Sequence, residues 1–362
     1  MQNLVKFTCQ ESKTYQGKLK ISNGSPLVSV ILLNWNGRKY LKDCLDSLIN
    51  QIFQNFEIII IDNGSRDGSC ELIREKYCDF RLIINNCNKG FAIGNNQGIK
   101  IAKGKYIALL NNDAEADPYW LLELVKKAEE DPSIGMVVSK IYLKGNNKVL
   151  DNVGHLIYPD GLNRGHGRLE KDYGQYDKEE EALFPSGCAA LYRKEMLDEI
   201  GLFDEDFFAY GDDTDIGLKG RLAGWKCIYA PRAVVYHKYS QSTGAYSPLK
   251  AFYVERNRIW IVIKYFPLSK LLLSPIFTFL RLALQAYGAL VGQGAAGKFR
   301  KEYSALLLLR IFFKAQVSAL KGLPKMLRKR KEIKKITRLS SKEIKTLLNR
   351  FRMTTKEIAL KD

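Results

Sequence analysis

Long apolar runs in the first third of the chain are separated by stretches in which hydrophobic and polar residues mix. The runs LVSVILL at 27–33 and EIIIID at 57–62 are rich in β-branched residues and do not alternate, which is typical of strands buried on both faces of a mostly parallel sheet. A helix is expected between them, over residues 40–50, and a further strand in KYIALLNND, which ends at 111–113. The pattern predicts an α/β fold, with a mostly parallel sheet flanked by helices.

Polar residues follow the first two of these predicted strands. Asn34 and Asn36 come directly after the first, and Asp62 and Asn63 end the second. Open α/β sheets bind ligands at the carboxyl ends of their parallel strands. Taken alone, Asp62 is as compatible with a turn as with a ligand contact, because Asp and Asn are frequent turn formers.

A glycine-rich segment, NKGFAIGNNQG, occupies residues 88–98. Its glycines let the backbone approach a ligand closely. A dinucleotide-binding fingerprint is a poor alternative, since the G-x-G-x-x-G spacing is absent. The segment is therefore a candidate binding loop of another kind.

An acidic cluster near residue 210 contains the strongest candidates for catalytic or metal-binding side chains. Asp212, Asp213 and Asp215 fall within four residues, and a strand-like segment farther on ends at His237. Crowded carboxylates repel one another, so a fold tolerates them where a metal, a cationic substrate or proton transfer offsets the repulsion. For an isolated D-D-x-D the alternative is a solvated acidic turn.

These ordered motifs, from residue 27 to residue 245, resemble glycosyltransferase family 2, whose members have a GT-A-type fold. The segment 207–237 is similar to the family pattern F-F-x-Y-x-E-D-x-D-L-x-x-R…V-x-H, and 88–98 matches N-x-G-F-A-x-G-N-N-x-G at every fixed position. The resemblance implies contacts to a nucleotide-sugar donor or acceptor from Asn34, Asn36, Asp62, Asn63, Lys89, Gly90, Asn95, Asn112 and Asp212.

The resemblance also implies roles for three further residues. Asp213 matches the family's catalytic Asp, so it is expected to take the proton from the acceptor hydroxyl in an inverting transfer. Asp113 and His237 are expected to hold Mn²⁺ or Mg²⁺ on the donor diphosphate. Asn111 stands where the first Asp of the family's metal motif often is, and Gly211 and Asp212 depart from the pattern before Asp213.

Three other segments add softer signals within the same resemblance. The Gly-rich, basic segment 161–168 is either a surface loop or part of the acceptor side, and 185–193 matches a strand of the active-site floor. Arg256 is a candidate contact for an anionic acceptor or for the diphosphate, because guanidinium pairs bidentately with phosphate. The processive-synthase motif Q-x-x-R-W is absent near 219–225, which favours addition of a single sugar.

Composition and cysteine usage indicate a reducing compartment. The seven cysteines are scattered, are odd in number and form no C-x-x-C pair, which argues against a disulfide framework or a zinc site. Residues 1–25 are polar and contain no apolar signal-peptide core. We therefore expect a protein on the cytoplasmic face of the cell membrane.

Charge is concentrated at the C-terminus. Residues 295–362 contain 20 Lys or Arg and 5 Asp or Glu, out of a formal net charge of +18 for the chain. Before them, 271–297 is apolar but interrupted by Pro275 and several glycines, and 302–320 predicts a helix with an apolar face and a basic edge. These features favour helices lying on an anionic membrane surface, with the basic run 325–335 against the headgroups.

The sequence thus predicts an N-terminal extension (1–26), a nucleotide-sugar-binding half (27–120), an acceptor-binding and catalytic half (121–245) and a helical, basic, membrane-associating region (246–362). The predicted function is inverting sugar transfer to a lipid-linked saccharide in cell-surface polysaccharide synthesis, with rhamnose as a donor sugar by resemblance. One alternative is a non-catalytic sugar-nucleotide-binding protein. The other is a nucleic-acid binder, which the scarcity of aromatic residues in the basic tail disfavours.

Overall fold

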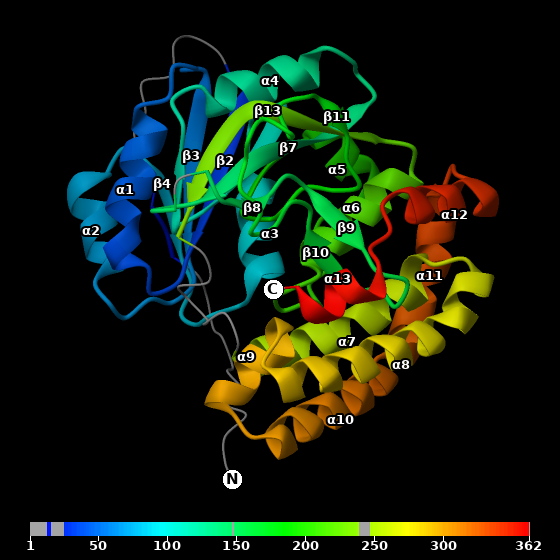
Figure 1. The fold of residues 1–362 in the computed structure, drawn as a ribbon. Helices are drawn as coiled ribbons and strands as arrows, with labels where there is room; N and C mark the ends of the chain where they lie inside the picture. Colours follow the sequence, from blue (N-terminus) through cyan, green and yellow to red (C-terminus); the bar gives the residue numbers. More distant parts are fainter. Residues whose placement is uncertain (1–12, 16–24, 147, 239–246, 362) are drawn as a thin grey trace.

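The computed structural model describes residues 13–15, 25–146, 148–238 and 247–361 and shows a central sheet with helices on both faces (Figure 1). The sheet has the strand order β1-β4-β3-β2-β5-β12-β7-β13-β11, with β6 paired to β13 and β8 to β7. It is mixed, because β12 runs antiparallel to both of its neighbours. The predicted α/β class is confirmed.

The parallel part of the sheet contains the strands that the apolar runs predicted. They are β2 (Val28–Asn34), β3 (Phe56–Asp62), β4 (Arg81–Ile84) and β5 (Tyr106–Asn111). Asn34 pairs with Asp62, and Leu33 with Asn111, so these strands end at one edge. Their polar end residues are therefore neighbours, as predicted.

The other half of the sheet brings a distant segment to the same edge. It contains β7 (Ile134–Leu143), β12 (Ala189–Arg193) and β13 (Lys226–His237). The short strand β6 (Ala114–Ala116) pairs with β13 so that Ala114 faces His237. The remaining short strands are β1 (Lys13–Tyr15), β8 (Leu150–Asn152), β9 (His155–Ile157), β10 (Asn163–Gly165) and β11 (Glu180–Glu181).

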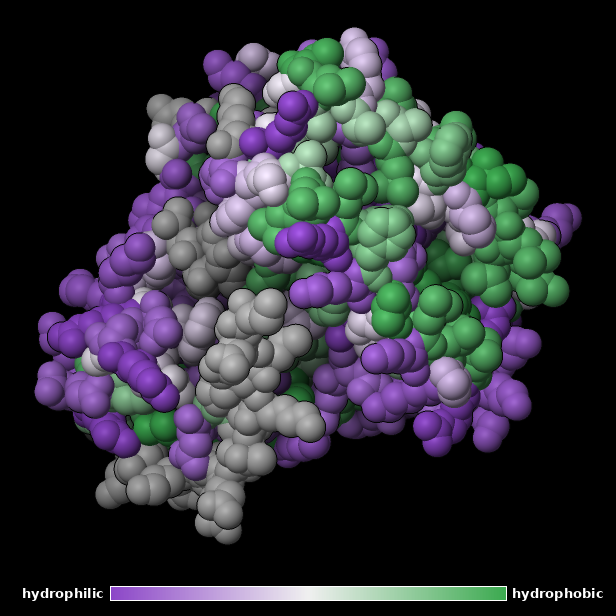
Figure 2. All heavy atoms as spheres, turned by 90° about the horizontal axis from the view of Figure 1, so that it is seen from below, coloured by the Kyte–Doolittle hydropathy of each residue, from purple (hydrophilic) through white to green (hydrophobic). Residues whose placement is uncertain are grey.

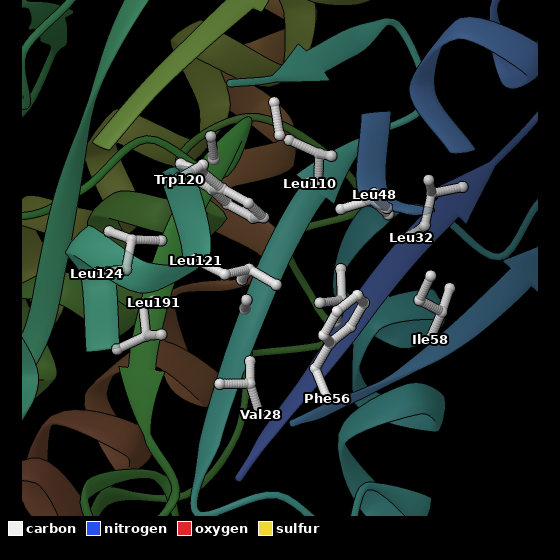
Figure 3. Close-up of a cluster of buried hydrophobic side chains, with 14 of the residues drawn as sticks. Val28, Leu32, Leu48, Phe56, Ile58, Leu110, Trp120, Leu121, Leu124 and Leu191 are labelled. Atoms are coloured by element: carbon white, nitrogen blue, oxygen red, sulfur yellow. The ribbon is translucent and has the colours of Figure 1, made fainter. Parts of the chain in front are cut away.

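Two hydrophobic clusters fill the two faces of the sheet. One packs α1 (Arg38–Ile49), α2 (Ser69–Lys76) and α4 (Trp120–Glu129) on the sheet, with Trp120, Leu121 and Leu124 at its centre (Figure 3). The other joins α3 (Phe91–Ile101), α5 (Lys194–Ile200) and α6 (Asp212–Leu222) to the opposite face. Each of the two clusters contains residues from before and after residue 120. Both halves predicted for 27–245 therefore contribute to both clusters.

The C-terminal region is helical, as predicted, and it packs on the α/β domain formed by the preceding residues. It comprises α7 (Pro248–Tyr265), α8 (Leu268–Val291), α9 (Gly294–Glu302), α10 (Ala305–Lys321), α11 (Leu323–Ile336), α12 (Ser341–Arg350) and α13 (Thr355–Leu360). A third cluster joins α7, α10, α11 and α12 to Phe207, Leu218 and Leu222.

Two expectations for this region were wrong in detail. Pro275 does not interrupt the apolar stretch, because α8 continues through it. Proline cannot donate to the carbonyl four residues before it, and the Ser274 hydroxyl donates to that Leu271 oxygen instead, at 2.8 Å. Part of the basic run is also used internally, since Lys329 pairs with Asp204 and Arg330 donates to the Phe266 carbonyl.

The cysteines mostly fit the expectation of reduced thiols. Cys44, Cys70, Cys78, Cys188 and Cys227 are free. Cys87, however, is disulfide-bonded. At that position the expectation of a reduced thiol is wrong.

Candidate functional site

The ends of β2 and β3 carry an interlocked set of polar side chains. Asn34 donates from Nδ2 to Asp62 Oδ2 at 2.7 Å and to Ser65 Oγ at 3.1 Å, and it accepts from Asn112 Nδ2 at 2.7 Å. Asp62 Oδ1 accepts the Ser65 backbone N–H at 2.8 Å. Asn34, Asp62 and Asn112 are all buried. The structure thus brings together three of the predicted donor-binding residues.

The glycine-rich segment begins α3 beside this network. Asn63 donates to the Gly90 carbonyl at 3.1 Å, and the Gly90 N–H donates to Asn88 Oδ1 at 2.9 Å. Gly90 has φ +85°, and a Cβ there would lie 2.4 Å from the Phe208 carbonyl oxygen. Only glycine fits this conformation and this close approach.

The other predicted donor-side residues lie around these two groups. Asn36 is exposed and accepts the Arg66 N–H at 2.8 Å, whereas Asn95 is buried and donates to the Phe91 carbonyl at 3.0 Å. Lys89 is partly exposed next to Gly90. Their contacts with a donor stay predictions.

Asp113 and His237 meet where β6 pairs with β13. His237 Nε2 lies 3.2 Å from Asp113 Oδ1, and His237 Nδ1 lies 2.8 Å from Asp151 Oδ2. Burial alone would lower the pKa of His237, but the Cys188 sulfur and the two carboxylates outweigh burial and raise the pKa well above its ordinary value. A cation bound at Nε2 would take the place of that nitrogen's proton.

This pair fits a divalent cation shared with a substrate. A carboxylate oxygen and an imidazole nitrogen are ordinary ligands of Mn²⁺, and a carboxylate on the far nitrogen is the usual support for a metal-binding His. Asp151 fills that second role, and Arg168 holds Asp151 in turn at 2.8 Å. Among the described residues no group of three or more candidate ligands occurs, so the remaining positions would come from diphosphate and water.

The acidic cluster lies in the first turn of α6. Tyr210 and Gly211 both have positive φ, +65° and +82°, which turns the chain sharply into the helix. Burial and the Asp213 charge raise the pKa of Asp212 well above its ordinary value. Asp213 is more exposed, and its Oδ1 accepts the Thr214 N–H at 2.7 Å. Of the two, Asp213 is the carboxylate placed to meet a substrate.

Asp215, the third acid of the cluster, is an anchor for the C-terminal region. It is fully buried, and its Oδ1 accepts from Lys264 and, at 2.7 Å, from the Tyr265 hydroxyl. Asn257 reinforces this link by donating to the Tyr210 carbonyl at 2.6 Å. Helix α7 therefore supports the loop that presents Asp213.

Arg256 is held on the same helix by contacts within the protein. It donates to the Asp206 carbonyl at 3.0 Å, and its guanidinium lies 4.1 Å from the centre of the Trp260 ring. Its predicted contact with an anionic substrate stays a prediction.

The segment 161–168 joins the site through the β9–β10 hairpin. Asn163 bonds to Thr214, the neighbour of Asp213, and His155 on β9 lies 3.7 Å from Asp213. Sequence reasoning missed His155 and Asp151, although the segment DNVGH at 151–155 does combine an acid and one of three histidines.

Comparison with known proteins agrees with this geometry. Residues 29–201 match the family profile described as glycosyl transferase family 2. The chain is 28% identical over 234 residues to the O-antigen biosynthesis protein RfbC of Myxococcus xanthus, covering 61% of this chain and 18% of that protein. It is 26% identical over 222 residues to the poly-beta-1,6-N-acetyl-D-glucosamine synthase of Staphylococcus epidermidis, covering 60% and 51%. The chain thus spans at most about half of these relatives.

Solved structures show the same fold. The mannosyltransferase PcManGT from Pyrobaculum calidifontis, in complex with GDP-Man and Mn²⁺, superposes with a TM-score of 0.51 and 16% identity over 84% of this chain and 89% of that one. GalNAc-T7 with UDP, GalNAc and Mn²⁺ gives a TM-score of 0.57 and 17% identity over 73% and 51%. Residues 29–201 are thus similar to glycosyltransferase family 2, and the α/β fold of the chain is of the GT-A type.

Proposed function

We propose that this protein is an inverting glycosyltransferase that moves one sugar from a nucleotide-sugar to a hydroxyl of a lipid-linked saccharide in cell-surface polysaccharide synthesis. The proposal rests on Asp213, which lies 3.7 Å from His155, and on the Asp113–His237 pair, which Asp151 supports at 2.8 Å from His237. Burial lowers the pKa of His155, and the charges of Asp213 and Asp151 oppose that effect. We infer that a base and a diphosphate site belong to one centre.

In this proposal, different residues have different roles in the transfer. The Asn34–Asp62–Asn112 network holds the nucleotide, because its side chains are fixed at the sheet edge. The acceptor oxygen bonds to the anomeric carbon while the bond from that carbon to the diphosphate breaks, and Asp213 takes the acceptor's proton. Burial and the Asp213 charge raise the pKa of Asp212, and a protonated Asp212 carboxyl can donate a hydrogen bond to the sugar.

Asp113 and His237 would hold Mn²⁺ or Mg²⁺, which when bound neutralises the charge that develops on the leaving diphosphate. Asp151 keeps the His237 ring in place for that role. The Mn²⁺ in PcManGT and GalNAc-T7 supports the same proposal.

A donor screen tests the function. The full chain is incubated with Mn²⁺, farnesyl-diphosphate-linked N-acetylglucosamine and, in turn, UDP-N-acetylglucosamine, UDP-galactose, GDP-mannose and dTDP-rhamnose. Mass spectrometry should find one added hexose, deoxyhexose or acetamido-hexose with one donor. Donor binding without transfer or hydrolysis would favour the non-catalytic alternative.

We further propose that the C-terminal helices place the enzyme on the cytoplasmic face of the membrane. Seen from below, hydrophobic residues gather over these helices (Figure 2). On α10, Leu306, Leu309, Phe313, Val317 and Leu320 are each more than half exposed, and Arg310, Lys314 and Lys321 adjoin them. An exposed apolar row with a basic edge and no acidic residue suits an anionic bilayer surface.

Helix α8 supplies a second apolar row and is, in the described residues, the helix long and apolar enough to cross a membrane. Its contacts favour an orientation in the membrane plane. Arg281, near its middle and 1% exposed, pairs with Asp160 at 2.7 Å and with Glu255 at 2.8 Å. A spanning α8 would carry these charges and their loop to the centre of the bilayer, which is costly.

Sedimentation with vesicles tests the membrane proposal. The protein should pellet with phosphatidylglycerol-containing vesicles at low salt, be partly released at high salt, and need detergent for complete release. Leu309→Gln with Phe313→Gln should weaken binding by about tenfold or more, since each side chain buries substantial apolar area. Ile49→Gln with Ile52→Gln is the matched control, because those residues are 51% and 50% exposed at and just after the end of α1, outside the C-terminal helices. Equal binding by both pairs would contradict the proposal.

A further inference from the structure

His155 is a polar group inside the site that makes no side-chain hydrogen bond among the described residues. Both ring nitrogens are buried and unpaired, and so is the Tyr192 hydroxyl. Folded proteins rarely leave buried donors and acceptors without partners. Tyr192 lies close enough to Asp213 and Asp212 that their charges, together with the larger effect of burial, raise its pKa. Two unsatisfied groups from two strands therefore converge on the start of α6.

His155 Nε2 and Asp213 Oδ2 are close enough for one oxygen atom that lies beside them to reach both. His155 Nε2 lies 3.7 Å from Asp213 Oδ2, which is too long for a good hydrogen bond. Asp213 Oδ1 already accepts the Thr214 N–H at 2.7 Å, so Oδ2 is the oxygen left for a substrate. A hydroxyl oxygen about 2.8 Å from both Nε2 and Oδ2 would hydrogen-bond to both.

The surroundings of His155 hold its ring in this position. The ring stacks on Phe184 with centroids 5.2 Å apart and an interplanar angle of 12°. Its backbone N–H donates to the Phe184 carbonyl at 3.2 Å, and β9 pairs with β10. Burial lowers the pKa of His155, which favours the neutral ring with a single N–H. Stacking and strand pairing thus hold the ring in place, and its neutral form can donate one hydrogen bond.

We propose that His155 positions the acceptor, by donating from Nε2–H to the oxygen of the hydroxyl whose proton passes to Asp213 Oδ2. This inference rests on the proposed glycosyltransferase function. The hydrogen bond uses one lone pair of the hydroxyl oxygen, and the other lone pair forms the bond to the anomeric carbon. The bond from that carbon to the diphosphate oxygen breaks, its electron pair leaves with the diphosphate, and His155 exchanges no proton.

Substitution of His155 by a ring without nitrogen tests the proposal. His155→Phe keeps a flat ring over Phe184 and removes the donor, whereas His155→Gln retains an N–H. The matched control is Tyr119→Phe, which also removes a polar group from an aromatic ring, at a side chain that is 52% exposed before α4. The assay uses farnesyl-diphosphate-linked N-acetylglucosamine as acceptor, the donor that the wild-type protein accepts, calorimetry for donor affinity and a thermal melt for folding.

We expect kcat/KM for the acceptor to fall about tenfold in His155→Phe, mainly through KM, with donor affinity unchanged. His155→Gln should recover part of the loss, and Tyr119→Phe should behave as wild type. If His155→Phe fails to fold, His155→Met fills the site and also lacks a donor.

Three results would overturn the inference alone: wild-type acceptor kinetics in the variant without a donor, an equal loss in His155→Gln, or an equal loss in Tyr119→Phe. Absence of transfer by the wild-type protein would overturn the proposed function, and this inference with it.

Discussion

Two parts of the site differ in how completely their polar groups are paired: the donor edge, which is the Asn34–Asp62–Asn112 network, and the base side, which is Asp213 with His155 and Tyr192. At the donor edge Asn34 bonds to Asp62, Ser65 and Asn112 at once. At the base side the His155 nitrogens and the Tyr192 hydroxyl are buried without partners in the described structure. A closed network is rigid before a ligand arrives, whereas open groups take their last hydrogen bonds from the ligand. The donor side is therefore preformed, and the acceptor side is completed by its substrate.

The largest expected effect separates chemistry from donor binding. Asp213→Asn should lower kcat by about 10²–10⁴, the usual contribution of a positioned base. Donor affinity should stay nearly unchanged, because the described hydrogen bonds of the Asp213 side chain go to Thr214 and not to the network at the ends of β2 and β3. Steady-state kinetics with calorimetric donor titration measure both quantities.

Asp212→Asn is the matched control one residue away. Burial and the Asp213 charge raise the pKa of Asp212, which favours the uncharged carboxyl, so an amide of the same shape should change kcat much less. If Asp212→Asn is the crippling change and Asp213→Asn stays active, the assignment of the base is wrong.

Removal of the proposed cation ligands should lower donor affinity, whereas Asp213→Asn should lower kcat. Asp113→Ala should reduce Mn²⁺-dependent donor affinity by about 100-fold or more, because changes behind metal ligands already cost about 10–100-fold. His237→Ala should act in the same direction with a smaller effect. Donor titrations with Mn²⁺ and with EDTA check both. Equal donor affinity in wild type and Asp113→Ala at saturating metal would remove the metal role.

Asp151 offers a finer test of the same site. Asp151→Asn keeps an oxygen that can accept from the His237 Nδ1–H but removes the charge, so Mn²⁺ affinity should fall by about tenfold. Asp172→Asn, a buried carboxylate that pairs with Lys140 away from His237, is the control. A loss of Mn²⁺ affinity in Asp172→Asn as large as in Asp151→Asn would indicate a general effect of losing a buried charge.

The sequence was most informative where one strand determines the position of a residue. Asn34 and Asp62 follow buried apolar runs, and parallel pairing alone makes their positions adjacent. His237 was placed at a strand end by the same reasoning. The continuity of α8 through Pro275 was not predicted, because it depends on a hydroxyl of the preceding residue.

Residues whose role depends on tertiary contacts were out of reach. Asp151 and His155 follow a turn with no motif, and only the β9–β10 hairpin brings His155 to Asp213. Lys329 belongs to the basic run that the sequence assigned to the membrane surface, yet it pairs with Asp204, as does Lys264. Charge counts cannot distinguish a solvated lysine from one that anchors a helix.

The smallest expected effect tests whether the donor edge is truly preformed. Asn34→Ala leaves Asp62 Oδ2 and Asn112 Nδ2 without their partner, and unsatisfied buried polar groups cost about 1–3 kcal/mol. We therefore expect a loss of that size in the free energy of unfolding by urea, a several-fold weaker donor affinity and an unchanged kcat. The control is Asn55→Ala before β3, where the side chain is exposed and accepts a single backbone N–H, that of Leu27. If the two variants lose equal stability, or if Asn34→Ala binds donor as tightly as wild type, the network does not preorganise the donor side and the contrast with the base side fails.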